Sequence, residues 1–208
     1  MALSGIGGHV RRALTIGVVG TLALLATGAA PAAADTASSS GTSVHVVLRG
    51  VQNQFVGDVV LTTLNSTSVL VAVRAQGLAP GFHGFHVHTV GVCDPQARDA
   101  TGAVVPFASA GGHFNPAGAT HSDHAGDLPV LLVMQNGVAV GSVVTDRFAI
   151  ADLLDADGSA IIVHAGRDNL ANIPTRYVQA ATGTPGPDAT TLATGDAGAR
   201  VACGVVAK

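Results

Sequence analysis

Histidines give the clearest chemical signal in this 208-residue sequence, which holds 9 His against 10 Lys and Arg. Charged residues make up only 11% of the chain, so scattered imidazoles on a polar surface loop are the less favoured explanation. The densest group has the spacing H-x7-H-x2-H-x2-D and consists of His113, His121, His124 and Asp127. Because three imidazoles and one carboxylate complete a tetrahedral set for Zn²⁺, this group predicts a closed zinc site of the structural type.

A second group of histidines falls on predicted strands. His86 and His88 are two residues apart, and a strand places such residues on the same face. The pair alone is a weak signal of metal binding. His164 ends an apolar run, where a lone histidine is more often a core or rim residue, but beside the other groups it becomes a candidate third or fourth ligand. A site made of imidazoles alone suits redox copper as well as zinc.

The elements that must position these residues are short strands. Alternating apolar residues separated by turn signals such as Asn136-Gly137 and Asp157-Gly158 favour a β-sandwich or Greek-key barrel. Two strand-poor stretches, residues 89–127 and 165–199, are long enough to be functional loops. The predicted strands cover residues 43–49, 57–64, 69–75, 82–88, 130–134, 138–145, 160–164 and 201–206.

The first 34 residues are typical of an export signal. Arg11 and Arg12 precede an uncharged apolar run, and Ala32-Ala33-Ala34 offers a small-residue cleavage site. An uncleaved membrane anchor is the alternative, and the route, Sec or Tat, stays open. No cysteine lies near the cleavage site, so a lipoprotein is excluded. We expect a signal peptide at 1–34, a flexible tether at 35–43, a single domain at 44–208, and an exported, secreted or envelope-associated product without membrane contact after cleavage.

Charge and cysteine content narrow the possibilities further. The formal net charge of −3 excludes a nucleic-acid binder that rests on a broad basic surface. Cys93 and Cys203 are the two cysteines of the chain, and in an exported protein two cysteines usually pair. Two free buried thiols and a Cys-His nucleophile are the alternatives.

Five segments, in order, resemble the copper/zinc superoxide dismutase family, and especially its exported actinobacterial branch. The resemblance runs from about Val44 to Val206 and implies an eight-stranded Greek-key β-barrel, an immunoglobulin-like sandwich, with two long functional loops. The segments are His83-Gly84-Phe85-His86-Val87-His88, Gly112-His113-Phe114-Asn115-Pro116, Gly126-Asp127-Leu128, Ile162-Val163-His164-Ala165-Gly166 and Gly198-Ala199-Arg200-Val201-Ala202-Cys203-Gly204-Val205.

The resemblance implies two ligand sets that share His113 as a bridging, catalytic imidazole. Asp168 is implied to link a copper-binding histidine to a zinc-binding one, and Arg200 to attract the anionic substrate. His83 is implied to be structural, and the cysteines to form the family disulfide. The implied copper ligands are His86, His88, His113 and His164; the implied zinc ligands are His113, His121, His124 and Asp127; the implied disulfide is Cys93–Cys203.

By this resemblance the chain is an enzyme that converts superoxide to O₂ and H₂O₂ by cycling Cu(II)/Cu(I), with a structural zinc beside the copper. The segment between His121 and His124 is much shorter than in the common eukaryotic members, yet all four zinc ligands are present, so we expect one copper and one zinc per chain. A homodimer is possible. The rival functions are an exported metal buffer or chaperone without turnover and an inactive interaction domain of the same fold.

Overall fold

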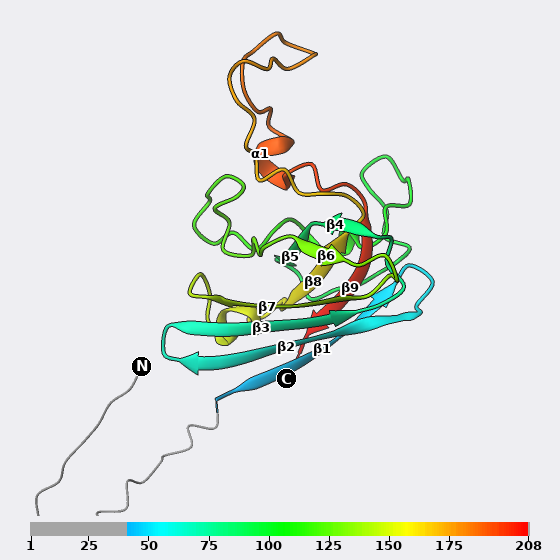
Figure 1. Cartoon of the computed structure of the whole chain (residues 1–208), viewed down its shortest axis with the longest axis vertical. Helices are drawn as coiled ribbons and strands as arrows, with labels where there is room; N and C mark the ends of the chain where they lie inside the picture. Colours follow the sequence, from blue (N-terminus) through cyan, green and yellow to red (C-terminus); the bar gives the residue numbers. More distant parts are fainter. Residues whose placement is uncertain (1–40, 208) are drawn as a thin grey trace, which may run out of the picture. The chain divides into compact units, whose positions relative to one another are not determined.

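Antiparallel strands form most of the regular structure of this protein, for which a computed structural model describes residues 41–207 (Figure 1). The larger sheet has seven strands in the order β5-β8-β9-β1-β2-β3-β7, and a small second sheet pairs β4 with β6. The bounds are β1 Ser43–Gly50, β2 Phe55–Asn65, β3 Ser68–Ala75, β4 Gly81–His83, β5 Phe85–His88, β6 Leu131–Val133, β7 Ala139–Thr145, β8 Ser159–His164 and β9 Arg200–Val206.

The core lies inside the curled sheet and consists mainly of aliphatic side chains, with Phe85, Phe114 and Phe148 among them. In β1 burial alternates strictly, with Val44, Val46 and Leu48 inward and the residues between them exposed. This alternation is what one buried face of an antiparallel sheet requires. Burying each such side chain contributes roughly 1.5–3 kcal/mol, so the aliphatic residues of the strands supply much of the stability of the frame. The prediction of an all-β protein is confirmed, whereas the Greek-key connectivity stays a prediction.

One predicted strand is wrong in its extent, because residues 82–88 are divided at Gly84 into β4 and β5. The Gly84 N–H donates to the Gly166 carbonyl, and the Gly84 carbonyl accepts from the His164 N–H. A Cβ at position 84 would lie 2.6 Å from the Cβ of Ala197, closer than side chains approach. The chain therefore changes partners here, from β6 to β8, and the described residues hold nine strands where eight were expected.

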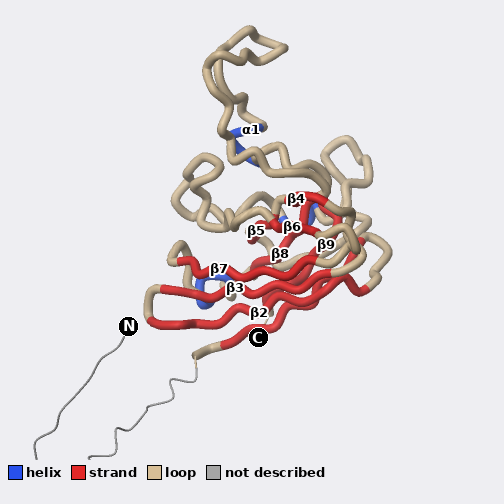
Figure 2. Tube along the Cα trace, viewed as in Figure 1, coloured by secondary structure: helices blue, strands red, loops and turns tan. Residues whose placement is uncertain are grey.

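Two long loops and three short helices connect the strands (Figure 2). The first loop contains the 3-10 helix η1, Ala108–Ala110, and the second contains α1, Thr191–Thr194. A further 3-10 helix, η2 Ile150–Leu153, lies between β7 and β8. Within residues 41–207 no helix is long and apolar enough to cross a membrane. The expected signal peptide and nearly all of the expected tether lie outside the described residues.

A disulfide joins the first long loop to the last strand, as expected. Cys93 and Cys203 are bonded, with their Cα atoms 5.7 Å apart. Cys203 is fully buried in a small apolar cluster with Phe107, Ala110 and Ile162. The loop that carries Phe107 is thus fixed covalently to the strand that begins at Arg200.

Candidate metal centre

Four buried histidines converge from two neighbouring strands and the first long loop. His86 and His88 lie on β5, and β5 pairs with β8, which ends at His164. His113 joins them through a bridge between its backbone and that of His88. One ring nitrogen from each of the four histidines lies within 4.8 Å of the others. The two-residue spacing on β5 therefore places both imidazoles in one site, as predicted.

Backbone carbonyls fix which nitrogen of two of these rings is free. The His88 Nδ1 donates to the Gly111 carbonyl at 3.0 Å, and the His164 Nδ1 donates to the Gly198 carbonyl at 3.0 Å. Each ring then presents an unprotonated Nε2, and these two Nε2 atoms lie 3.4 Å apart. Two lone pairs facing each other in a buried site repel unless a cation lies between them.

The ring nitrogens of His86 supply a further test of whether a metal ion fits the four-histidine group. The His86 Nε2 donates to Asp168 at 2.7 Å, while its buried Nδ1 has no hydrogen-bond partner within residues 41–207. An unpaired buried polar atom costs about 1–3 kcal/mol, and coordination of a metal removes that cost. The donor atoms of the group therefore fit a metal ion that prefers imidazole, as copper does.

The second ligand group lies on the other side of His113. Its members are the four residues of the predicted zinc set, and their donor atoms also lie within 4.8 Å of one another. The His113 Nδ1 lies 2.8 Å from Asp127, and the His124 Nδ1 lies 3.3 Å from the His113 Nδ1. His121 presents its Nδ1 3.0 Å from the same carboxylate. Three imidazoles around one carboxylate fit zinc, and His113 is a member of both groups.

Asp168 connects the two groups. Its Oδ2 accepts from the His86 Nε2 at 2.7 Å, and its Oδ1 accepts from the His121 Nε2 at 2.8 Å. The backbone N–H of Leu170 also donates to Oδ1, which holds the carboxylate in place. Carboxylates in this position fix the orientation and the tautomer of metal-binding histidines. The residue thus lies where the resemblance implied.

Burial and neighbouring charges shift the pKa values of the metal-free site. Burial lowers the pKa of His86 to about 4 and that of His164 to about 3, so both rings are neutral and ready to coordinate. Burial opposes the charge of His121 as well, but its close contacts with the carboxylates of Asp127 and Asp168 outweigh this and raise its pKa to about 9. Burial alone would raise the pKa of Asp127 and Asp168, but the surrounding imidazoles hold both well below the usual range.

Arg200 opens β9 and lines the cavity next to the four-histidine group. The cavity measures about 490 Å³ and is bounded by His88, His113 and His164 together with Thr190 and Thr194. The guanidinium donates to the carbonyls of Phe107 and Gly111, which belong to the loop held by the disulfide. Burial lowers the pKa of Arg200, yet a guanidinium stays protonated in proteins, so the cavity keeps a fixed positive charge.

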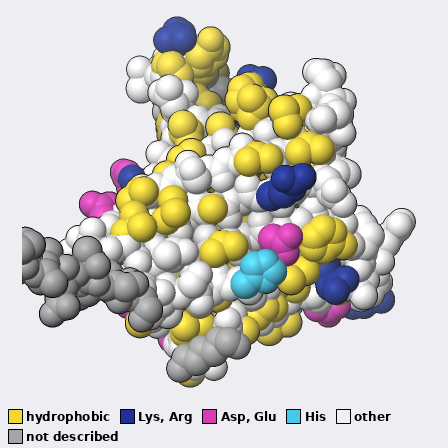
Figure 3. Space-filling view, turned by 60° about the horizontal axis from the view of Figure 1, so that its bottom comes forward, with side chains coloured by type: hydrophobic (Ala, Val, Ile, Leu, Met, Phe, Trp, Pro, Cys, Tyr) yellow, Lys and Arg dark blue, Asp and Glu magenta, His cyan; other side chains and the backbone are white. Residues whose placement is uncertain are grey.

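The remaining described histidines lie apart from both ligand groups. His83 is buried between the carbonyls of His164 and Ala79, to which its two ring nitrogens are 2.6 and 2.8 Å away. His45 is exposed on β1 and pairs with Asp58 at 3.1 Å. Figure 3 shows a histidine beside an acidic side chain on one face of the molecule. This face also exposes hydrophobic side chains and carries few charged ones.

Replacing Asp168 by asparagine should weaken zinc binding about 10- to 100-fold, the usual effect of losing an outer carboxylate partner. One amide oxygen can accept from only one of the two imidazoles, and the amide N–H₂ would face the N–H of the other. Competition of the copper-free protein with a chromophoric zinc chelator measures the loss. Asp99→Asn, in an exposed loop turn, is the matched control. Equal zinc affinity in Asp168→Asn and the parent protein would contradict this role.

Taken together, the geometry defines a class of protein: an all-β domain with a two-part histidine and carboxylate metal centre that opens to an arginine-lined cavity. Comparison with known proteins agrees. The model of the family described as copper/zinc superoxide dismutase matches residues 55–206. This protein belongs to the copper/zinc superoxide dismutase family.

Two curated relatives and one solved structure illustrate the similarity. A superoxide dismutase [Cu-Zn] of Mycobacterium tuberculosis is 53% identical over 142 residues, which cover 67% of this chain and 59% of the relative. One from Mycolicibacterium paratuberculosis is 43% identical over 184 residues, 86% and 77% of the two chains. The structure of the Cu/Zn superoxide dismutase from Brucella abortus superposes with a TM-score of 0.61 at 28% identity, covering 80% of this chain and 100% of that one. The match thus spans about three fifths of the length of the mycobacterial relative first named.

Proposed function

We propose that the protein is a superoxide dismutase, which turns two superoxide anions and two protons into O₂ and H₂O₂. The observation that carries the proposal is the arrangement of His113 between two complete ligand groups, beside a cavity that holds the Arg200 guanidinium. A simple metal store needs neither a shared imidazole nor a buried cation in an open cavity.

The ligand assignment belongs to this proposal. Copper would be held by His86, His88, His113 and His164, and zinc by His113, His121, His124 and Asp127. Bound copper supplies the one-electron oxidation and reduction that no side chain here can perform. The zinc-side ligands would keep the Nδ1 of His113 occupied, so that its Nε2 is the atom on which a proton can be held and released.

Arg200 would bring the substrate to the site. The formal net charge of the chain is −3, so attraction of an anion must come from local charge and not from the protein as a whole. Two carbonyls of the first long loop hold the guanidinium in place beside the cavity. Binding of the anion therefore does not have to order this side chain. The cavity is also lined by the neutral Thr190 and Thr194 and by one carboxylate, that of Asp196, whose Oδ2 accepts from Asn169 and Thr191.

The test combines metal content with the rate of superoxide consumption. We expect about one copper and one zinc per chain after loading, activity that disappears with copper removal, and roughly a 10-fold lower kcat/KM at low ionic strength in Arg200→Ala. That size is the lower end of what electrostatic steering contributes. Arg74→Ala, on the exposed face of β3, is the control. Copper binding without any superoxide consumption would leave a metal buffer as the function.

The place of action is proposed to be outside the cytoplasm. The Cys93–Cys203 disulfide supports this, because such bonds persist in oxidising compartments. Immunoblotting of cell and medium fractions tests it, and mass spectrometry of the exported form tests cleavage after Ala34. The possible homodimer stays a prediction.

A further inference from the structure

The zinc-binding segment is short, and a residue far along the chain supports it. Only two residues separate His121 from His124, and two more separate His124 from Asp127. So compact a segment makes few bonds of its own that could keep three ligands in position. Its Asp123 N–H bonds to the Thr120 carbonyl and its Asp127 N–H to the His124 carbonyl.

Arg147 contacts this segment from the loop after β7. Its guanidinium Nη1 donates to the Ser122 carbonyl at 3.0 Å and to the His124 carbonyl at 3.2 Å. Its Nη2 lies 3.7 Å from the Asp123 carboxylate. The Arg147 side chain thus contacts three consecutive residues, Ser122 to His124. His124 is a proposed zinc ligand, and Ser122 directly follows His121, another proposed zinc ligand.

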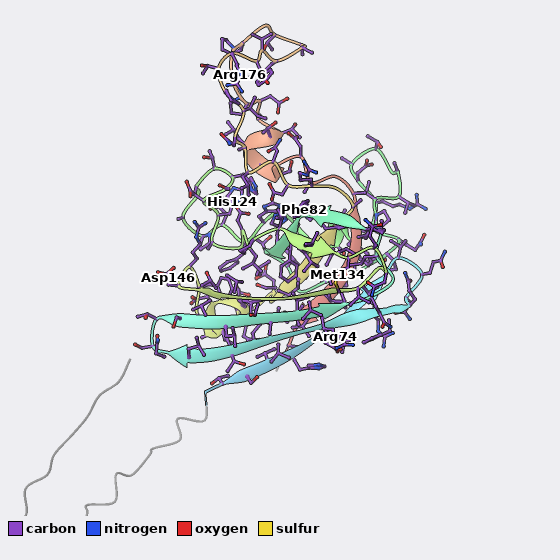
Figure 4. All side chains as sticks on the ribbon, in the orientation of Figure 1. Arg74, Phe82, His124, Met134, Asp146 and Arg176 are labelled. Atoms are coloured by element: carbon purple, nitrogen blue, oxygen red, sulfur yellow. A yellow bond between two sulfur atoms is a disulfide. The ribbon has the colours of Figure 1, made fainter. Side chains whose placement is uncertain are left out.

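The backbone of this arginine is held by contacts on both sides. Its backbone N–H donates to the hydroxyl of Thr145, the last residue of β7, and the next residue, Phe148, is buried in the core. Figure 4 shows His124 and Asp146, the neighbour of Arg147, on the same side of the molecule. A backbone held in this way and a planar guanidinium give the two carbonyls a defined place in space.

Charge alone cannot explain the contact. The Arg147 side chain is 42% exposed and that of Asp123 is 79% exposed, so their ion pair contributes little. A cation close to a zinc site repels the metal, which on its own would weaken zinc binding. The contact is therefore explained by its two hydrogen bonds to the backbone carbonyls of Ser122 and His124. These bonds fix the position of the backbone on either side of Asp123.

We infer that Arg147 is a positioning residue for zinc, which holds the backbone of residues 122–124 so that His121 and His124 face the Asp127 carboxylate before the metal arrives. The inference rests on the proposed zinc site. It explains how a short segment can present three ligands without a longer supporting loop. Such a residue lowers the ordering cost that binding would otherwise include.

The experiment compares zinc affinity in Arg147→Ala, Arg147→Lys and the parent protein, by chelator competition. We expect about a 10-fold loss in Arg147→Ala, the lower end for partners that orient ligands, and a smaller loss in Arg147→Lys, which keeps the charge but not the planar fork. Copper affinity measured in the absence of zinc should not change, because Arg147 does not contact His86, His88 or His164. Arg74→Ala is again the matched control; Figure 4 shows Arg74 far from His124.

A second measurement reads coordination geometry directly. Cobalt(II) placed in the zinc site gives a visible spectrum that depends on its ligand arrangement, and we expect that spectrum to change in Arg147→Ala but not in Arg74→Ala. Zinc affinity equal to or above that of the parent protein, the result expected from charge repulsion alone, would overturn the inference. If Arg147→Ala does not fold, the same comparison in Arg147→Lys decides. If the parent protein binds no zinc at all, the proposed zinc site fails, and the inference with it.

Discussion

Replacing His164 by alanine is expected to reduce the rate of superoxide consumption more than about 100-fold and to lower the copper content of the loaded protein. Loss of an outer partner of a metal ligand already costs roughly 10- to 100-fold, and His164 offers its Nε2 directly to the site. The smaller side chain also leaves one more open position near the metal, where water would replace the imidazole.

The fold should survive this change. His164 is the last residue of β8, and its ring makes one hydrogen bond, to the Gly198 carbonyl. Losing that bond costs about 1–3 kcal/mol, which leaves a typical domain folded. His45→Ala is the matched control, since it removes an exposed imidazole from β1. Metal analysis and a superoxide assay of both variants, with circular dichroism as a check, measure the result. Equal rates in His164→Ala and His45→Ala would refute the enzymatic function.

Removing the disulfide, by the double change Cys93→Ala and Cys203→Ala, is expected to lower the free energy of unfolding by roughly 4–5 kcal/mol. The bond closes a loop across a sequence separation of 110 residues, and a crosslink of that span restricts the unfolded chain by about this amount. Alanine avoids placing a hydroxyl in the apolar cluster around Phe107 and Ile162. Urea unfolding of the metal-free protein measures the change.

The same variant should lose activity beyond its loss of stability. The first long loop carries Phe107 and Gly111, whose carbonyls hold the Arg200 guanidinium. Without the crosslink this loop is free to shift, and Arg200 with it. Treating the parent protein with a reductant should reproduce both effects. A change in unfolding free energy below about 1 kcal/mol would show that the unfolded chain gains little from the crosslink.

The sequence groups the candidate ligands much as the structure does, because their spacing is local. A two-residue step on a strand places His86 and His88 on one face whatever the rest of the chain does, and the group from His113 to Asp127 is contained in fifteen residues. Even so, the spacing alone suggests a separate four-ligand zinc site. That His113 also faces the histidines of β5 and β8 depends on contacts between distant segments, and only the resemblance to a known family implied it.

Other features had no local signal. The division of a predicted strand at Gly84 depends on the close approach of Ala197, more than a hundred residues later in the chain. In the sequence, Arg147 is simply an arginine that follows an apolar strand. No neighbouring residue indicates that its guanidinium contacts the backbone of Ser122 and His124. Such contacts across the fold depend on how far the strands curl, which alternation of apolar residues does not determine.

The position of Asp168 and His113 between the two ligand groups has a thermodynamic consequence. Because one imidazole belongs to both groups and one carboxylate contacts a histidine in each, we expect the free energies of binding at the two proposed metal sites to be coupled. Coupling of this kind is reciprocal: the factor by which a first ion changes the affinity for the second is the same in either order of loading. In the proposed assignment, the supply of one metal in the surroundings would therefore set how firmly the protein retains the other.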